Sequence, residues 1–176
     1  HKPNATDTMK KYFDLETVNT KYTTPDDFKN LLSTLSENSA SNPYSIKIKG
    51  LTEDNFQKIR EALSTINRKI YIDLSPSDLR GCPSIFDNSY FLGEAYQELL
   101  TGITLPEDLT YIGTNVFNGC INLKAISIPQ LVTDIGRKAF YNCISLEEVT
   151  LLTSIKSIDG HAFDHDADKT SKLSKI

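Results

Sequence analysis

The sequence has no tryptophan and only one methionine, three cysteines, three histidines and eight glycines among its 176 residues. Three cysteines are too few for a disulfide framework, and an odd number leaves at least one thiol unpaired within the chain. Basic residues (19) do not outnumber acidic ones (23), so a net charge of −4 gives no reason to expect nucleic acid or an anionic membrane as a partner. Apolar runs are short, so no transmembrane helix is predicted.

Catalytic motifs are missing too. The sequence has no P-loop, no Gly-x-Gly-x-x-Gly, no Gly-x-Ser-x-Gly and no Cys-x-x-Cys. Acidic pairs such as Glu147-Glu148 are typical of ordinary surface charge. We therefore predict that the chain is not an enzyme and uses no cofactor.

A repeat of 23 residues is the strongest pattern present. With 39% hydrophobic residues, the chain can bury a core, and its length fits one domain or one short repeat array. The first clear copy is Ile112-Gly113-x-x-Val116-Phe117-x-x-Cys120-x-x-Leu123-x-x-Ile126-x-Ile128. The second is Ile135-Gly136-x-x-Ala139-Phe140-x-x-Cys143-x-x-Leu146-x-x-Val149-x-Leu151, and a third begins at Ile158 and fades. One such unit cannot bury its own apolar face, so the period predicts stacked coils.

Alternating apolar residues predict short strands near 44–49, 69–74, 102–105, 125–128 and 148–151. Two helices are expected at about 25–37 and 53–67, with Thr24 and Thr52 as caps and Pro25 in the first turn. In the later coils, we expect the return path to be a short helical turn around Val116-Phe117 and Ala139-Phe140. Phe117, Phe140, Leu123 and Leu146 should be buried together.

Four regions follow from this pattern. We expect a polar tether over 1–20, helix-rich N-terminal cap coils over 21–75, repeat coils over 76–160, and a C-terminal cap or frayed tail over 161–176. A degenerate last strand near Lys172–Ser174 is one alternative for the tail. No charged-then-apolar leader follows His1, so a secretion signal is not present in this chain, and we expect a chain trimmed at its N-terminus.

The string Ile-Gly-x-x-Ala-Phe-x-x-Cys-x-x-Leu-x-x-Ile-x-Ile-Pro resembles the BspA-type leucine-rich repeats of bacterial surface antigens. The match is close at 112–129 and 135–151, and the segment 71–75 resembles the leader of spirochaete members. The resemblance implies an α/β fold: a right-handed leucine-rich-repeat solenoid with a concave parallel sheet and a helix-rich N-terminal cap. It also implies export to the cell envelope, with lipid anchoring in many members, and a role in adhesion or virulence. The Asn ladder of ordinary leucine-rich repeats is absent, because Asp108, Leu131 and Ser154 stand at its positions.

The concave sheet face is the predicted partner-binding surface. Side chains between the buried strand positions should line it, with small residues in the later coils. We expect the partner to contact Lys47, Tyr71, Asp73, Thr104, Ala125, Ser127, Glu148 and Thr150, with Lys124 and Glu147 at the rim. The alternative is a solvated face that binds nothing.

The cysteines and histidines are weaker candidates. Cys120 and Cys143 are equivalent in successive coils, so we expect buried free thiols, with a disulfide as the alternative. Cys82 lies in an insertion, where it is inert or cross-links chains. His161 and His165, spaced i, i+4 among aspartates, could bind adventitious zinc or nickel, but a solvated cap explains them as well. The insertion with Tyr90, Leu92 and Tyr96 is expected to pack in the core or to support self-association.

The sequence thus favours a non-catalytic protein-binding module, an adhesin of the bacterial envelope that contacts host extracellular proteins. The alternative is a periplasmic structural or assembly protein that self-associates through its solenoid ends, so a second copy of the chain is the other candidate partner.

Overall fold

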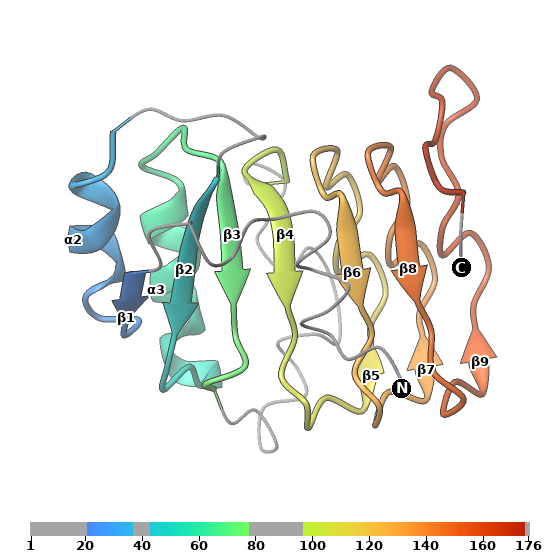
Figure 1. Cartoon of the computed structure of the whole chain (residues 1–176), viewed down its shortest axis with the longest axis horizontal. Helices are drawn as coiled ribbons and strands as arrows, with labels where there is room; N and C mark the ends of the chain where they lie inside the picture. Colours follow the sequence, from blue (N-terminus) through green and yellow to red (C-terminus); the bar gives the residue numbers. More distant parts are fainter. Residues whose placement is uncertain (1–20, 37–42, 78–96, 175–176) are drawn as a thin grey trace.

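The computed structural model describes residues 21–36, 43–77 and 97–174. In these residues the chain winds through stacked coils whose strands form two parallel sheets (Figure 1). The larger sheet has the strand order β1-β2-β3-β4-β6-β8, and the second has the order β5-β7-β9. The predicted parallel-sheet solenoid is confirmed.

The larger sheet contains all five strands that the sequence predicts, each within two residues of its expected bounds. Its strands are β1 (Lys21–Thr23), β2 (Tyr44–Ile48), β3 (Ile70–Asp73), β4 (Leu100–Thr104), β6 (Ala125–Ser127) and β8 (Glu148–Thr150). The β1 strand was not predicted. It pairs in parallel with β2, with Lys21 opposite Ile46.

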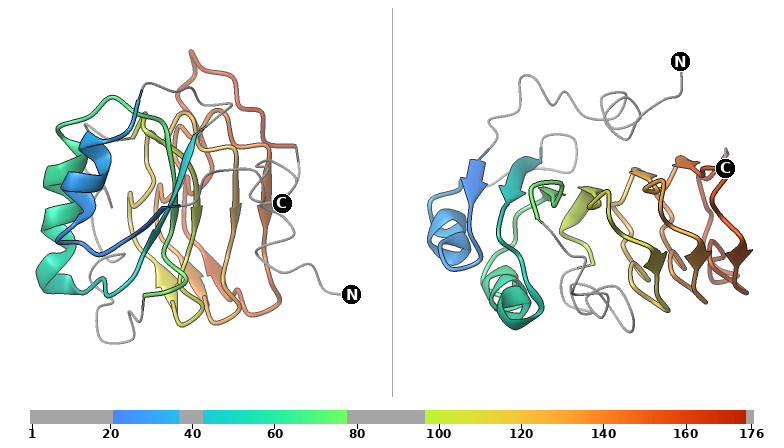
Figure 2. Two further views of the ribbon diagram at one scale, coloured as in Figure 1. Left: turned by 60° about the vertical axis from the view of Figure 1, so that its left-hand side comes forward. Right: turned by 90° about the horizontal axis from the view of Figure 1, so that it is seen from below.

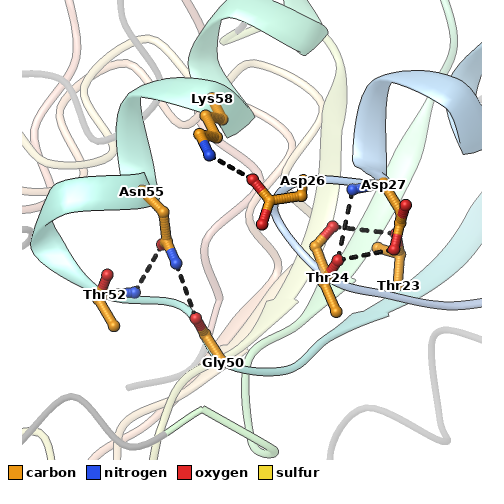
Figure 3. A network of polar contacts seen from close by, with 8 residues as sticks. All are labelled: Thr23, Thr24, Asp26, Asp27, Gly50, Thr52, Asn55 and Lys58. Atoms are coloured by element: carbon orange, nitrogen blue, oxygen red, sulfur yellow. Dashed lines mark hydrogen bonds and ion pairs between the residues drawn. The ribbon is translucent and has the colours of Figure 1, made fainter.

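Helix α2 (Phe28–Ser33) is shorter than the predicted helix over 25–37. Thr24 does not cap it, because residues 24–27 form a turn in which the Asp27 amide donates to the Thr24 carbonyl oxygen at 3.2 Å. The Thr24 hydroxyl in turn donates to an Asp27 carboxylate oxygen at 2.9 Å (Figure 3). The turn uses the polar groups that a helix start would need, so the helix begins at Phe28.

Helix α3 (Glu53–Leu63) starts where the sequence predicts, with Thr52 as its N-cap. The Asn55 side-chain oxygen accepts the Thr52 amide at 2.7 Å, and its nitrogen donates to the Gly50 carbonyl at 2.9 Å (Figure 3). The helix ends four residues before the predicted boundary at residue 67. The Ser64 and Thr65 hydroxyls bond to carbonyl oxygens three residues back, and such bonds compete with a continuing helix.

The two helices cover one face of the larger sheet in the N-terminal third of the solenoid (Figure 2). An ion pair between Lys58 of α3 and Asp26 joins the second helix to the turn before the first (Figure 3). In the later coils, the short strands β5 (Tyr111–Ile112), β7 (Asp134–Ile135) and β9 (Ser157–Ile158) take the helices' place. The hydrophobic core fills the space between the larger sheet and these elements.

A stack of phenylalanines runs through the core of the later coils. The Phe117 and Phe140 ring centroids lie 5.2 Å apart, and those of Phe140 and Phe163 lie 5.1 Å apart, with nearly parallel rings in both pairs. Leu123 and Leu146 are buried beside them, as the period predicts. The spacing is close to the distance of about 4.8 Å between neighbouring strands, so each coil advances by one strand width.

The turns before each cysteine lie where the sequence predicts a short helical turn, but they are hydrogen-bonded turns and no helix is assigned there. The Cys120 amide donates to the Phe117 carbonyl at 3.1 Å, and the Cys143 amide donates to the Phe140 carbonyl at 3.2 Å. Neighbouring turns also bond to each other, as the Phe117 amide does to the Ala139 carbonyl at 2.8 Å. The stacked coils thus share backbone hydrogen bonds on the helix side as well as in the larger sheet.

The C-terminal segment continues the stacking beyond β8. The Lys172 amide donates to the Ile144 carbonyl and the Ser174 amide to the Glu147 carbonyl, each at 3.2 Å. Leu173 packs against the core between these two bonds. No strand is assigned at the tail's described residues, so the degenerate last strand is present only as backbone pairing.

Candidate functional site: the concave sheet face

The predicted binding residues lie in two rows across the larger sheet. In one row, Lys47 lies opposite Asp73, and Asp73 opposite Thr104. On the C-terminal side, Ser127 lies opposite Thr150. The neighbouring row holds Tyr71 opposite Gly102, and Ala125 opposite Glu148. These residues alternate with core positions along each strand, so they share the face turned away from α2 and α3, which we call the concave face.

The β4–β6 pairing joins the two halves of these rows. Ile103 lies opposite Ile126, and both side chains are fully buried in the core. The residues that follow them, Thr104 and Ser127, are therefore neighbours on the concave face. The structure thus brings together the whole set that the sequence predicts.

The N-terminal half of the concave face is a polar cluster. The Lys47 ammonium lies 3.1 Å from an Asp73 carboxylate oxygen, which forms an ion pair across β2 and β3. The other Asp73 oxygen accepts the Ser75 amide at 2.9 Å. The Tyr71 hydroxyl hydrogen-bonds to the Thr104 hydroxyl. Burial raises the pKa of Tyr71 to about 12, so its phenol stays protonated at neutral pH and can donate.

Burial divides the set into two groups. Tyr71, Asp73, Ala125 and Ser127 are buried, and the most exposed of them reaches only 7%. The half-buried members are Lys47, Thr104, Glu148 and Thr150. Sequence alternation predicted that all eight face outward, but it could not predict how closely neighbouring side chains cover the small residues. Any partner that docks on the concave face reaches chiefly the second group.

The rim of the concave face follows the same coil register. The Lys124 amide donates to the Thr101 carbonyl at 3.1 Å, and the Glu147 amide donates to the Lys124 carbonyl at 2.9 Å. Both side chains are half-buried. The rim residues are therefore held by backbone ladder bonds just before β6 and β8, next to Ala125 and Glu148.

Equivalent residues of successive coils lie side by side in this sheet, as they do in leucine-rich repeats. Comparison with a family model leads to the same assignment. The model for the BspA type leucine rich repeat region matches residues 86–175 in six copies. The chain belongs to this family. Leucine-rich repeats of this kind are protein-interaction modules, generally non-catalytic, and BspA-type members are typically associated with the cell surface or envelope. No curated protein matches the chain. In the described residues, no helix combines the length and the apolar character needed to cross a bilayer.

The repeat's cysteines lie inside the BspA-type coils as free thiols. Cys120 and Cys143 are both buried, and the Cys143 thiol donates to the Phe117 carbonyl at 3.1 Å. Burial raises the pKa of Cys120 to about 12. Burial, with the neighbouring Cys120 as a second cause, raises the pKa of Cys143 well above its usual value. Cys82 lies outside the described residues, as does the insertion with Tyr90, Leu92 and Tyr96.

Both buried thiols should therefore resist modification while the coils are folded. In a Cys82→Ser background, we expect an aromatic disulfide reagent to label the native chain more than about 100-fold slower than the chain in denaturant, because the thiolate is the attacking species. The absorbance of the released thiol measures both rates. Rapid labelling of the native chain would contradict the buried thiol ladder.

The two candidate metal ligands bond to different groups. The His161 Nδ1 atom lies 2.7 Å from an Asp164 carboxylate oxygen, and the His165 Nδ1 atom lies 2.9 Å from the Asp166 carbonyl oxygen. Across the part of the chain that the structure describes, no three His, Cys, Asp or Glu side chains gather as a metal site requires. The zinc or nickel site at His161 and His165 stays a prediction, which calorimetry with zinc would check.

Asp166, one of the aspartates near the candidate metal ligands, has a structural role that the sequence pattern did not predict. Its carboxylate accepts hydrogen bonds from the Tyr141 hydroxyl at 2.7 Å, the Asn142 amide nitrogen at 2.8 Å and the Lys169 ammonium at 2.8 Å. Its own backbone amide donates to the Asn142 side-chain oxygen at 2.9 Å. The terminal turn is thereby bound to the preceding coil. Lys169, then Tyr141 and Asn142, hold the pKa of the Asp166 carboxyl far below its usual range.

The lowered pKa of Asp166 determines how the stability of the fold changes with pH. Asp166 stabilises the fold above the unfolded-state pKa of about 3.9, and this contribution declines as the pH falls below that value toward the folded-state pKa. We expect Asp166→Asn to lower the thermal midpoint at neutral pH, with the deficit shrinking below pH of about 4. Melting curves across the pH range would measure the deficit. Asp168→Asn, which removes a nearby exposed carboxylate, is the control. A deficit that is equal at all pH values would refute the role assigned to the Asp166 charge.

Proposed function

We propose that the chain is an adhesin of the bacterial cell envelope that binds a host extracellular protein on its concave face. The observation that supports this proposal is the register of the two rows, which presents residues of five strands on one rigid sheet. A face built on strands holds its side chains in fixed relative positions. Binding therefore costs little conformational entropy on this side of the interface. Half-buried Lys47 lies on β2, toward one end of the concave face. Glu148 and the rim residue Glu147 lie at the other end, at β8.

The charge distribution favours a partner segment that is basic where it meets the last strand. Glu147 and Glu148 are adjacent at β8, and the half-buried Thr150 hydroxyl lies two residues along the same strand. At the other end, Asp73 pairs with Lys47 and so adds no net charge there. Glu147 and Glu148 lie beside the rim residue Lys124, and a partner's lysine or arginine can donate hydrogen bonds to carboxylates there.

The test is binding of the purified chain to a panel of host matrix proteins, measured by a surface-based titration. Ser127 is too buried to accept a long side chain, so the informative variant is Glu148→Lys with Thr150→Arg, both at half-buried positions. We expect saturable binding by the parent and at least about tenfold weaker binding by this variant.

A matched control changes the same number of charges on the second sheet. Asp134→Lys with Thr133→Arg alters an exposed carboxylate and a half-buried threonine on the opposite side of the solenoid. It should bind like the parent. Equal loss in both variants would mean that net charge, and not the concave face, controls binding. No binding by any form would refute the adhesin proposal.

Location in the envelope is tested separately. An adhesin must be accessible to added protease on intact cells, whereas a periplasmic assembly protein must be protected until the outer membrane is broken. Protection on intact cells would contradict the surface location that we propose.

A further inference from the structure

Two of the eight glycines follow an asparagine or an aspartate, at Asn118-Gly119 and Asp159-Gly160. Such pairs can modify themselves. The backbone nitrogen of the glycine attacks the side-chain amide or carboxyl carbon of the residue before it, and a five-membered cyclic imide forms. Glycine favours this ring closure because it has no β-carbon to restrict the backbone. In a folded chain, the reaction depends on where the attacking nitrogen and the side chain are held.

The fold holds Asn118-Gly119 away from the geometry of ring closure. The Gly119 amide donates to the Tyr141 carbonyl of the next coil at 2.8 Å, so the attacking nitrogen is already engaged. The Asn118 side-chain nitrogen donates to the Asn115 side-chain oxygen at 3.1 Å, which holds this side chain against the residues before it. Both residues of the pair are half-buried. Ring closure at Asn118 would have to break both hydrogen bonds.

The fold holds Asp159-Gly160 close to the geometry of ring closure. The Gly160 amide donates to an Asp159 carboxylate oxygen at 2.8 Å. The carboxyl carbon is bonded to that oxygen, so the nitrogen lies beside the atom that it would attack, as a near-attack geometry requires. Both residues are exposed, and a β-carbon at Gly160 would meet no atom within 4 Å. The pair thus has both the contact and the space that the reaction needs.

We propose that Asp159-Gly160 is a spontaneous modification site, at which Asp159 converts to isoaspartate while the chain is folded. The Gly160 nitrogen bonds to the Asp159 carboxyl carbon, and one carboxyl oxygen leaves as water with the amide proton and one proton from solvent. Water then breaks the bond between this nitrogen and the original backbone carbonyl carbon, and a proton returns to solvent. The chain now runs through the side chain, and its mass is unchanged. The inference is independent of the function proposed above.

Isoaspartate would weaken the attachment of the coil that contains β9, because it adds one carbon to the backbone between two hydrogen bonds that join this coil to the one before. The Asp159 amide donates to the Ile135 carbonyl at 2.8 Å, and the Gly160 carbonyl accepts from the Lys138 amide at 3.4 Å. The longer backbone cannot keep both bonds in their present register, and each coil is stabilised chiefly by its neighbours. Separated by chromatography, the modified form should unfold at a lower temperature than the unmodified form.

The test is incubation of the folded full chain for several weeks in neutral buffer at physiological temperature. The aged and fresh chains are then digested with a protease that cleaves before aspartate but not before isoaspartate. Mass spectrometry measures the fraction left uncleaved before residue 159, and a gain in peptide mass reports the loss of ammonia from Asn118. We expect the uncleaved fraction to grow with time while Asn118 stays unchanged. An aged chain that is still cleaved before Asp159 as completely as the fresh chain would overturn the proposal.

Two variants test the geometry itself, and circular dichroism checks that both are folded. Gly160→Ala introduces no clash and should slow the reaction at least about tenfold, because a β-carbon restricts the backbone rotation that ring closure needs. Asp159→Asn gives the chain two Asn-Gly pairs. In the folded chain, the pair at 159 should lose ammonia at least about tenfold faster than Asn118, with comparable rates in denaturant. Equal rates in the folded chain, or no effect of Gly160→Ala, would overturn the proposal as well.

Discussion

Replacing Phe140 with alanine is expected to lower the free energy of unfolding by about 3–5 kcal/mol, the range for truncating a buried aromatic residue. Phe140 is the middle ring of the stack, 1% exposed, and it contacts Phe117 on one side and Phe163 on the other. Its removal leaves a cavity that two coils share. Because each coil is stabilised chiefly by its neighbours, the defect should weaken the coils on both sides.

Denaturant titration with a circular dichroism signal measures this loss. Phe163→Ala is the control, because Phe163 ends the stack and is only half-buried, so its truncation should cost clearly less. Should Phe140→Ala unfold at the same denaturant concentration as the parent, the stacking of the coils described above would be wrong.

Replacing Gly136 with alanine is expected to destabilise the chain by about 1–3 kcal/mol, the usual cost of overpacking. A β-carbon at Gly136 would lie 2.8 Å from the Gly113 carbonyl carbon and 2.8 Å from the Thr114 amide nitrogen. Both are backbone atoms of the preceding coil, so they cannot move aside as the end of a flexible side chain could. The two coils would have to separate locally.

Gly160 provides the comparison. A β-carbon there has nothing within 4 Å, so Gly160→Ala should be nearly neutral or slightly stabilising. Thermal unfolding of the two variants beside the parent gives both differences. If the Gly136→Ala and Gly160→Ala chains unfold at the same temperature, the two coils are less tightly packed at this turn than the structure shows.

Apolar alternation predicts five of the six strands of the larger sheet, because one buried face forces a simple alternation in each strand. The period of 23 residues predicts the phenylalanine stack, since equivalent residues of stacked coils must meet. The second sheet was missed, although its signal was present in Ile112, Ile135 and Ile158. Strands of two residues contain no alternation to detect, and their pairing depends on coils that are distant in sequence.

The candidate site could be predicted in placement but not in accessibility. Alternation assigns Tyr71 and Ser127 to the concave face, and the strand register agrees. Their burial depends on packing by neighbouring side chains, which no local pattern encodes. The N-terminal helix was predicted too long for a similar reason. Thr24 and Asp27 bond to each other in a turn, and Pro25 is as compatible with a turn as with a helix start.

The most direct test of the central claim, that the concave face binds a protein, is carboxylate footprinting of the chain with and without its bound partner. A carbodiimide reagent modifies accessible acidic side chains, and mass spectrometry locates the products. Binding on the concave face should protect Glu147 and Glu148 and leave Asp134, on the second sheet, as reactive as before. Protection of Asp134 with no change at Glu147 and Glu148 would contradict the claim and place the partner on the opposite side of the solenoid.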